Sequence, residues 1–240
     1  MTDVTERVPK VPPLVEMTEF WTDLSPESRA EILSEAQLLD FAAGETIEID
    51  FGLMISGTAA IEYMVGNGRR CLVELFHSGD LIDLCRRERR PQGRLVGLGY
   101  GSMLVLSVAD FEACARHHAD VLAAYRRRVE DQTGRLRDHI NDLAVKTPLE
   151  RIVAVLFELR RWPEARLGEA TDIILPILRK DIAAYTGMKP ETVSRALRRL
   201  LEAGLIRSGA HDRETITLID PPVLRQIANG SASKTLEEGR

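Results

Sequence analysis

The spacing of hydrophobic and polar residues changes twice along the chain. Residues 44–107 contain short runs of alternating hydrophobicity, separated by glycines and by the turn Gly66-Asn67-Gly68. This pattern is typical of strands, which we expect at residues 45–49, 53–63 (broken at Ser56-Gly57), 70–76, 95–100 and 102–107. An acidic helix at residues 25–39 precedes them, because Ser25-Pro26-Glu27 offers an N-cap and a proline suited to a first turn. Short strands without intervening helices predict a β-barrel or β-roll.

Residues 110–143 contain no proline and carry apolar residues at intervals of three and four. This spacing predicts one long amphipathic helix. Its apolar stripe needs a partner surface, and pairing with a second copy across a two-fold axis provides one. Packing of the whole helix on its own β domain is the alternative that the pattern leaves open.

The C-terminal third predicts a winged helix-turn-helix. Helices are expected at residues 149–159, 178–185 and 190–203, with a tight turn at Thr186-Gly187 between the last two. Strands at residues 206–208 and 215–219 flank a turn at 209–213 and predict a hairpin. A helix, a short glycine-containing turn and a second helix form the helix-turn-helix pattern, and the hairpin is its wing.

The helix at 190–203 has one apolar side and one polar side. Its apolar positions, expected to pack inward, are Val193, Ala196, Leu197, Leu200 and Leu201. The opposite side carries Glu191, Ser194, Arg195, Arg198 and Glu202. A carboxylate can accept a hydrogen bond from cytosine N4, and a guanidinium can bind guanine O6 and N7. We therefore expect base reading by Glu191, Ser194 and Arg195, with phosphate contacts from Lys180, Arg198, Arg199, Arg207 and Arg213. A solvated charged face is the competing interpretation.

Composition and charge agree with this reading. The chain has 240 residues, which favours two domains, and its net charge is −5. Residues 1–50 carry three basic and twelve acidic residues, whereas residues 176–213 carry eight basic and four acidic ones. A basic module in an acidic chain favours a polyanionic partner. Three widely spaced cysteines favour a reducing cytoplasm, and the absence of a run of about 20 apolar residues predicts no membrane span. No catalytic motif is present, so we do not expect an enzyme.

Three motifs of the C-terminal region resemble the DNA-binding domain of CRP/FNR-type bacterial transcription regulators. They are Pro-Ile-Leu-Arg-Lys-Asp-Ile-Ala at 176–183, Glu-Thr-Val-Ser-Arg at 191–195 and Glu-Ala-Gly-Leu-Ile at 202–206. Gly44-Glu45-Thr46, Ser56-Gly57 and Gly79-Asp80 are placed like the turns of that family's β-roll, so the resemblance covers roughly residues 20 to 225. It implies an α+β protein with a cyclic-nucleotide-binding-like β-roll, a long dimerisation helix and a C-terminal winged helix-turn-helix.

The expected organisation has five parts. They are an N-terminal segment (1–24), the β-roll sensor (25–109), the dimerisation helix (110–145), the DNA-binding domain (146–230) and a disordered polar tail (231–240). The resemblance implies a cytoplasmic homodimer that binds double-stranded DNA and RNA polymerase as an activator. The spacing of Glu191, Ser194 and Arg195 is similar to the FNR-like branch, in which these positions read a TTG-containing half-site. Pro190 stands where the cyclic-AMP receptor branch has an arginine.

The sensor departs from the family pattern. Gly79 is followed by Asp80, and Arg94 by Leu95-Val96-Gly97, so the cassette that holds a cyclic nucleotide is absent and we do not expect cyclic AMP. Residues 1–70 contain no cysteine, so an FNR-type iron–sulfur cluster is not expected either. Cys85, in an arginine-rich segment, and His77 are the candidate sensor residues, and haem ligation is their family-based interpretation. An effector- or haem-binding dimer whose C-terminal domain mainly contacts protein is the alternative function.

Overall fold

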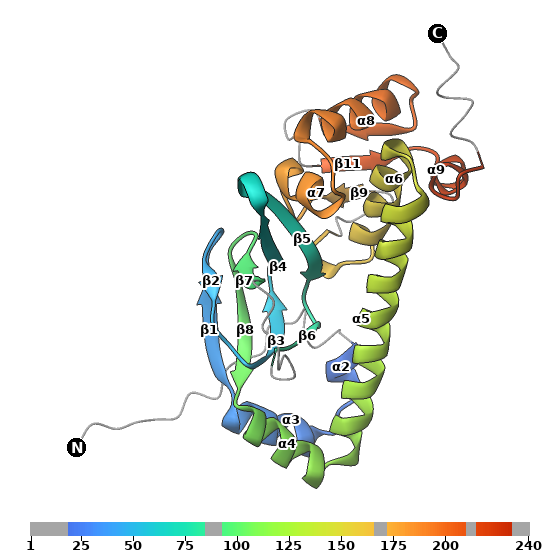
Figure 1. Ribbon diagram of the computed structural model, residues 1–240. Coiled ribbons are helices and arrows are strands. Elements are labelled where there is room, and N and C mark those ends of the chain that lie inside the picture. Colours follow the sequence, from blue (N-terminus) through green and yellow to red (C-terminus); the bar gives the residue numbers. More distant parts are fainter. Residues whose placement is uncertain (1–18, 85–92, 166–171, 210–214, 232–240) are drawn as a thin grey trace.

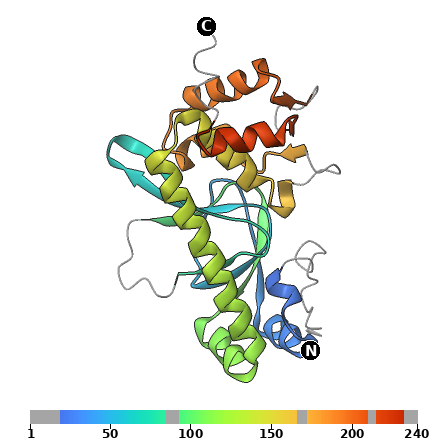
Figure 2. The ribbon, with the colours of Figure 1, turned by 90° about the vertical axis from the view of Figure 1, so that its right-hand side faces the viewer.

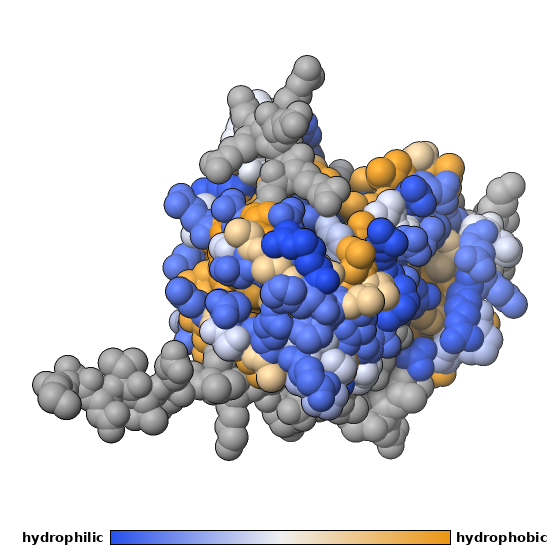
Figure 3. Space-filling view, turned by 90° about the horizontal axis from the view of Figure 1, so that it is seen from below, coloured by the Kyte–Doolittle hydropathy of each residue, from blue (hydrophilic) through white to orange (hydrophobic). Residues whose placement is uncertain are grey.

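The computed structural model describes residues 19–84, 93–165, 172–209 and 215–231. It shows a mixed helix and strand protein whose three parts are a β-roll, a long helix beside it and a C-terminal helical domain (Figure 1). Within the described ranges, no helix is both long and apolar enough to span a membrane. The face of the β-roll end seen from below is mainly hydrophilic with scattered apolar residues (Figure 3).

The β-roll consists of two four-stranded antiparallel sheets, with strand orders β1-β8-β3-β6 and β2-β7-β4-β5. The strands are β1 (Gln37–Phe41), β2 (Thr46–Ile47), β3 (Phe51–Ser56), β4 (Ala59–Val65), β5 (Arg69–Phe76), β6 (Leu81–Asp83), β7 (Arg94–Gly97) and β8 (Gly101–Leu106). Gly57 turns the chain between β3 and β4 at φ +80°, and a Cβ there would lie 2.4 Å from the carbonyl oxygen of Tyr100. The predicted β-roll and its break at Ser56-Gly57 are therefore confirmed.

Two strands of the β-roll escaped the sequence prediction. The expected helix at 25–39 ends at Glu35, as α3 (Pro26–Glu35), and the following residues form β1 instead. The physical reason is that β1 pairs with β8 along its whole length, and this ladder outweighs the local helical tendency. The second missed strand, β6, has only three residues and is therefore too short to show a period.

The single helix expected at 110–143 is two helices, α4 (Val108–His117) and α5 (Ala119–Val145), which meet at His118. His118 has an extended backbone and ends α4. The short helix α2 (Glu19–Thr22) and α3 pack against this corner, where Phe20, Trp21, Phe111 and Val121 share one buried cluster.

Contacts from α3 hold the break in place. Glu31 lies 2.9 Å from Nδ1 of His117 and 2.7 Å from Nε2 of His118. On the α5 side, the Asp120 carboxylate accepts hydrogen bonds from the backbone N–H of Ser25 at 2.7 Å and from the Ser28 hydroxyl. The split is thus a tertiary effect, since an isolated helix has no reason to end at His118.

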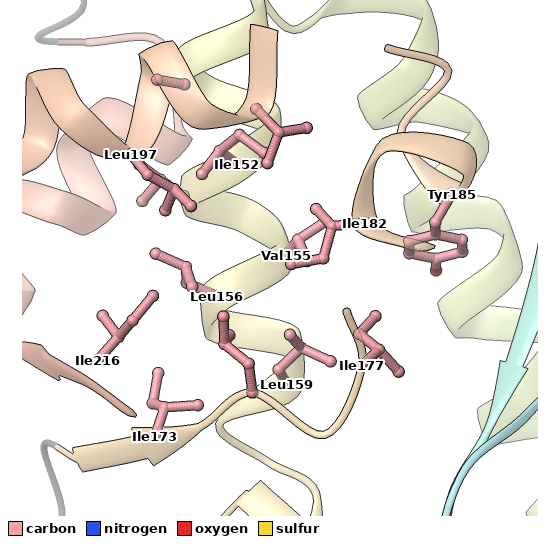
Figure 4. Packing of buried hydrophobic residues seen from close by; sticks show 14 of the residues in the cluster. Ile152, Val155, Leu156, Leu159, Ile173, Ile177, Ile182, Tyr185, Leu197 and Ile216 are labelled. Carbon is pink, nitrogen blue, oxygen red and sulfur yellow. The ribbon is translucent and has the colours of Figure 1, made fainter. Parts of the chain in front are cut away.

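The C-terminal domain packs four helices and a small sheet around one core (Figure 4). Helix α6 (Pro148–Leu159) runs through its centre; Ile152 projects from it toward Leu197, and Leu156 projects toward Ile216 of the sheet. The remaining elements are β9 (Asp172–Ile174), α7 (Arg179–Tyr185), α8 (Pro190–Glu202), β10 (Ile206–Ser208), β11 (Thr215–Leu218) and α9 (Pro221–Ala228). The sheet order is β10-β11-β9, so the expected hairpin gains a third strand.

The long helix α5 spans the molecule from the α3–α4 corner to the C-terminal domain (Figures 1 and 2). Arg151 of α6 joins its end to the helix-turn-helix, since its guanidinium donates to the carbonyls of Leu143 at 2.7 Å and Lys146 at 3.0 Å, and to that of Thr186 at 3.2 Å. These bonds satisfy carbonyls that the last turn of a helix leaves without partners. A rotation of α5 would therefore be transmitted to the turn before α8.

Candidate nucleic-acid interface

Helix α8 lies at the outer end of the C-terminal domain, where it exposes one long polar face (Figure 1). Val193, Ala196, Leu197 and Leu200 are buried against the core, as the apolar period predicts. Leu201 differs from the prediction because it is 39% exposed. It follows the buried Leu200 by one residue, and a 100° step along the helix turns its side chain out of the core.

The turn before α8 is tight and internally bonded. Gly187 adopts φ +67°, the left-handed conformation that glycine takes at little cost. The Thr186 hydroxyl donates to the carbonyl of Ile182 at 2.6 Å, and the N–H of Met188 donates to the carbonyl of Ala183. Pro190 is in the first turn of α8, where its missing N–H is not needed. The helix-turn-helix geometry therefore follows from local residues.

The three expected base-reading residues lie together near the start of α8. Glu191 and Arg195 are exposed, and Ser194 is half-buried. The guanidinium of Arg195 makes a long hydrogen bond, 3.4 Å, to the hydroxyl of Thr192 one turn earlier. One carboxylate, one hydroxyl and one guanidinium are thus displayed on a single helix face, the set that can address base edges in a major groove.

Cations surround this face. The side chains expected to contact phosphate are exposed at Lys180 on α7, Arg198 and Arg199 on α8, and Arg207 on β10. Arg213 lies outside the described residues, between β10 and β11. Exposed cations on three elements around one polar helix can neutralise phosphates on both sides of a groove.

The structure also reveals an ionic bridge that the sequence analysis missed. Arg70 of β5 donates to Oδ1 of Asp181 in α7 at 2.5 Å and also contacts Glu62 of β4. Asp181 caps its own helix, since its other carboxylate oxygen accepts from the N–H of Leu178. Arg94 of β7 bonds the second oxygen of Glu62 at 2.7 Å. The β-roll therefore holds the first helix of the helix-turn-helix directly.

The Glu62 carboxyl in this bridge is held in its ionised form. Burial opposes ionisation of Glu62, but the hydrogen bonds from Arg70 and Arg94 outweigh it and lower the pKa of Glu62. Glu62 and Asp181 expose only 3% and 2% of their side chains. Arg70 and Asp181 are 111 residues apart in the sequence, so local sequence patterns could not predict this ion pair.

The two candidate sensor residues have different outcomes. Cys85 lies outside the described residues. His77 sits at the contact between the β-roll and the C-terminal domain, where its ring lies 5.0 Å from the ring of Trp162. Its Nε2 lies 3.0 Å from the Arg135 guanidinium, and its Nδ1 lies 3.0 Å from the carbonyl oxygen of Ser78. In the structure His77 thus contributes to the contact between the β-roll and the C-terminal domain.

The remaining cysteines are not alike. Cys114 is buried in α4, and burial, with nearby Glu31, raises the pKa of its thiol to about 11. Cys71 of β5 is half-buried, opposite Tyr63 of β4. Among the described residues, no three His, Cys, Asp or Glu side chains are grouped to hold a metal ion.

Comparisons with known proteins find a matching family model and similar chains. A family model described as the Crp-like helix-turn-helix domain matches residues 150–227. The nitrogen fixation regulation protein FixK of Rhizobium meliloti (strain 1021) is 29% identical over 182 residues, which make up 65% of this chain and 83% of that protein. FixK of Bradyrhizobium diazoefficiens is 26% identical over 78% of this chain and 80% of its own length.

A solved structure agrees in fold. The structure of FixK2 from Bradyrhizobium japonicum matches with a TM-score of 0.69, covering 80% of this chain and 96% of that one at 23% identity. At this identity the likeness shows a shared arrangement of β-roll, long helix and helix-turn-helix.

Proposed function

We propose that this chain, which is a transcription regulator of the CRP/FNR family, works as a homodimer whose two α8 helices read a TTG-containing palindrome. The observation that carries the proposal is the polar face of α8, where Glu191, Ser194 and Arg195 are displayed opposite the buried Val193, Ala196, Leu197 and Leu200. Exposed cations on α7, α8 and β10 near this face favour DNA binding over a merely solvated helix face. The FixK relatives, named as regulators of nitrogen fixation, support the same class of function.

A second apolar stripe on α5 supports the proposed homodimer. The inner side of α5 is packed against the rest of the chain, with Val121, Ala124, Gln132 and His139 buried. The outer side of α5 carries Leu122, Val129 and Ile140, which are exposed, and Leu143, which is half-buried; Leu136 has the same seven-residue spacing and is half-buried. An apolar residue every seven positions fills one of the two core positions of a coiled-coil heptad, and Ile140 fills the other near the C-terminal end of the helix. Pairing of two α5 helices would cover this stripe and bring two helix-turn-helix domains to one side.

The residue roles follow from recognition chemistry. Arg195 would bind a guanine by two parallel hydrogen bonds, Glu191 would accept from a cytosine amino group, and Ser194 would add a hydroxyl contact. The phosphate contacts would come from Lys180, Arg198, Arg199, Arg207 and Arg213, which fix position without reading sequence.

Control would act on the geometry of the dimer. Two recognition helices must lie about 34–36 Å apart to enter successive major grooves. A signal on the β-roll could change this distance through α5, since Arg151 joins the end of α5 to the turn before α8. Constitutive DNA binding, set by the amount of protein, is the simpler form of the same proposal. RNA polymerase is the proposed partner of the DNA-bound dimer, as an activator.

The test is a fluorescence anisotropy titration of the purified chain against a labelled palindromic TTG…CAA duplex and a scrambled duplex. At about 0.15 M salt the palindrome should bind at least 1,000-fold more tightly, the lower limit for specific sites. Raising the salt should weaken binding steeply, because phosphate neutralisation releases counterions. Equal affinity for both duplexes would leave the polar face of α8 without a sequence-reading role.

A further inference from the structure

The β-roll and the C-terminal domain meet along a seam that contains several ionisable groups. On the β-roll side lie the turn from His77 to Asp80 and strand β5. The other side is formed by α6, α7 and Trp162, with α5 running alongside. Arg135 of α5 donates to Asp80 at 2.7 Å, and Asp80 is fully buried. Trp162, only 1% exposed, packs against His77 with its ring tilted by 32° and so belongs to the seam from the C-terminal side.

Glu158 of α6 faces a small cavity in this seam. The cavity is lined by Glu74, Leu75, Gln132, Arg135, Leu136, Glu158 and Tyr185, and has room for about one water molecule. The Tyr185 hydroxyl donates to the two oxygens of Glu158 at 3.1 and 3.3 Å. Glu158 is half-buried here, and the cavity beside its carboxylate admits about one water molecule.

The surroundings of Glu158 carry both signs of charge. Arg135, His139 and Asp142 lie on α5, Tyr185 on α7 and Glu74 on β5, with Arg161 just after α6. Burial raises the pKa of Glu158 to about 7, against the hydrogen bond of Tyr185 and the cations Arg135 and Arg161, while Asp142 adds to the rise. His139 stacks on Tyr185 at 3.7 Å, and burial lowers its pKa.

We propose that the seam between the β-roll and the C-terminal domain is a pH-responsive contact, closed while Glu158 is protonated and loosened when its proton passes to solvent. The bridge of Glu62, Arg70 and Asp181 holds the other end of the same seam, and its ion pairs lower the pKa of Glu62, so this carboxylate stays ionised. When the seam opens, the helix-turn-helix can therefore move while the Arg70–Asp181 contact still attaches it to the β-roll. Opening does not separate the domains completely.

The sign of the effect follows from linkage. In an opened seam Glu158 meets water and titrates near its ordinary pKa of 4.5, whereas in the closed seam it titrates near 7. The protonation of Glu158 therefore stabilises the closed form fully at low pH, and this stabilisation decreases as the pH rises from about 4.5 to about 7. Above pH 7 the effect levels off, because Glu158 is then ionised in both forms. The closed-to-open ratio should fall by roughly a few hundredfold over this range.

Trp162 reports on the seam directly. The chain contains two tryptophans, so the variant Trp21→Phe leaves Trp162 as the single one. Its emission maximum and its quenching by acrylamide are measured between pH 5 and pH 8.5 in the full-length chain. We expect emission to move to longer wavelength and the quenching constant to rise at least twofold between pH 5 and pH 7, then to stay constant.

Two further variants in this background assign the change to Glu158. Glu158→Gln keeps an oxygen for the Tyr185 hydroxyl but cannot ionise, so its Trp162 signal should not vary with pH. Glu112→Gln removes a carboxylate on the exposed side of α4, far from the seam, and should keep the full transition. A transition that survives Glu158→Gln would assign it to another group, such as His77, and would overturn the proposal. A flat signal in the parent would do the same.

Tyr185→Phe provides a second test that does not depend on removing the carboxylate. The Tyr185 hydrogen bond stabilises the ionised form of Glu158, so its loss should raise the pKa of Glu158 in the closed seam. The change in Trp162 emission should then continue above pH 7 before it levels off. An unchanged end point would contradict the assignment to Glu158, and circular dichroism at each pH shows that the variants remain folded.

Discussion

At the scale of single residues, the chain separates stabilising and recognising roles along α8. Buried Leu197 and Leu200 attach the helix to the core, and removing such side chains costs about 2–5 kcal/mol. Exposed Arg195 makes a hydrogen bond within its own helix, to Thr192, so its loss should leave the fold unchanged. A defect in DNA binding at position 195 can therefore be read as a defect in recognition.

The variant Arg195→Ala tests this reading. We expect it to lose about 1–3 kcal/mol of binding free energy per half-site and to relax the preference at one base pair, because a bidentate arginine–guanine contact has that value. Anisotropy titrations with the palindrome and with single base-pair substitutions measure both effects. Full discrimination by the variant would contradict the role of Arg195, and so would a loss of binding that follows a loss of thermal stability.

Lys180→Ala is the matched control. It also removes one exposed cation, but from α7, where we expect a phosphate contact. Affinity should fall for all sequences alike, and the slope of log affinity against log salt should decrease by about one per subunit.

At the scale of elements, local rules predict what local interactions decide. The faces of α8, the turn at Gly187 and the N-cap at Ser25 could be predicted, because period, φ and capping depend on neighbouring residues. Strand β9 could not, because it has three residues and exists through pairing with β11. The break at His118 and the contact of Arg70 with Asp181 depend on partners distant in sequence. The base-reading part of the site was therefore predictable and its attachment to the β-roll was not.

The junction of α3 with α5 makes a prediction of its own. Burial works against the charge of Asp120 less than the hydrogen bonds from Ser25, Ser28 and Val121 favour it, so its pKa is lowered. Asp120→Asn should therefore reduce the free energy of unfolding by about 1–2 kcal/mol at pH 7, toward the low end of the values for hydrogen bonds to charged groups, because Asp120 is partly exposed. A lowered pKa stabilises the fold above the ordinary pKa of Asp and ceases to do so in acid. Urea unfolding should show the difference at pH 7 and little of it at pH 3; an equal gap at both would contradict this assignment.

The outer stripe of α5 can be tested by a pair of adjacent substitutions. Ile140→Asp and Asn141→Asp each add one negative charge at an exposed position of α5, but only Ile140 belongs to the stripe. Sedimentation velocity should find weakened dimers, by at least tenfold, for Ile140→Asp and normal dimers for Asn141→Asp. Monomers at micromolar concentration in the unmodified chain, with and without DNA, would exclude the proposed pairing.

At the scale of the whole molecule, one rigid path joins the β-roll to α8. The β-roll fastens α7 through Arg70, and α5 reaches the turn before α8 through Arg151. In the proposed homodimer this path would set the distance between two recognition helices. Function would then depend on the spacing of the two half-sites as strongly as on their sequence.

The most direct test of the proposed dimer on a palindrome is therefore a change of half-site spacing. The palindromic TTG…CAA duplex is compared with a duplex that contains the same half-sites and about five additional central base pairs, half a helical turn. We expect one dimer to bind the first duplex tightly and the second at least 100-fold more weakly, because the second half-site has rotated to the opposite side of the DNA. Equal affinity for the two duplexes would contradict simultaneous reading by two α8 helices.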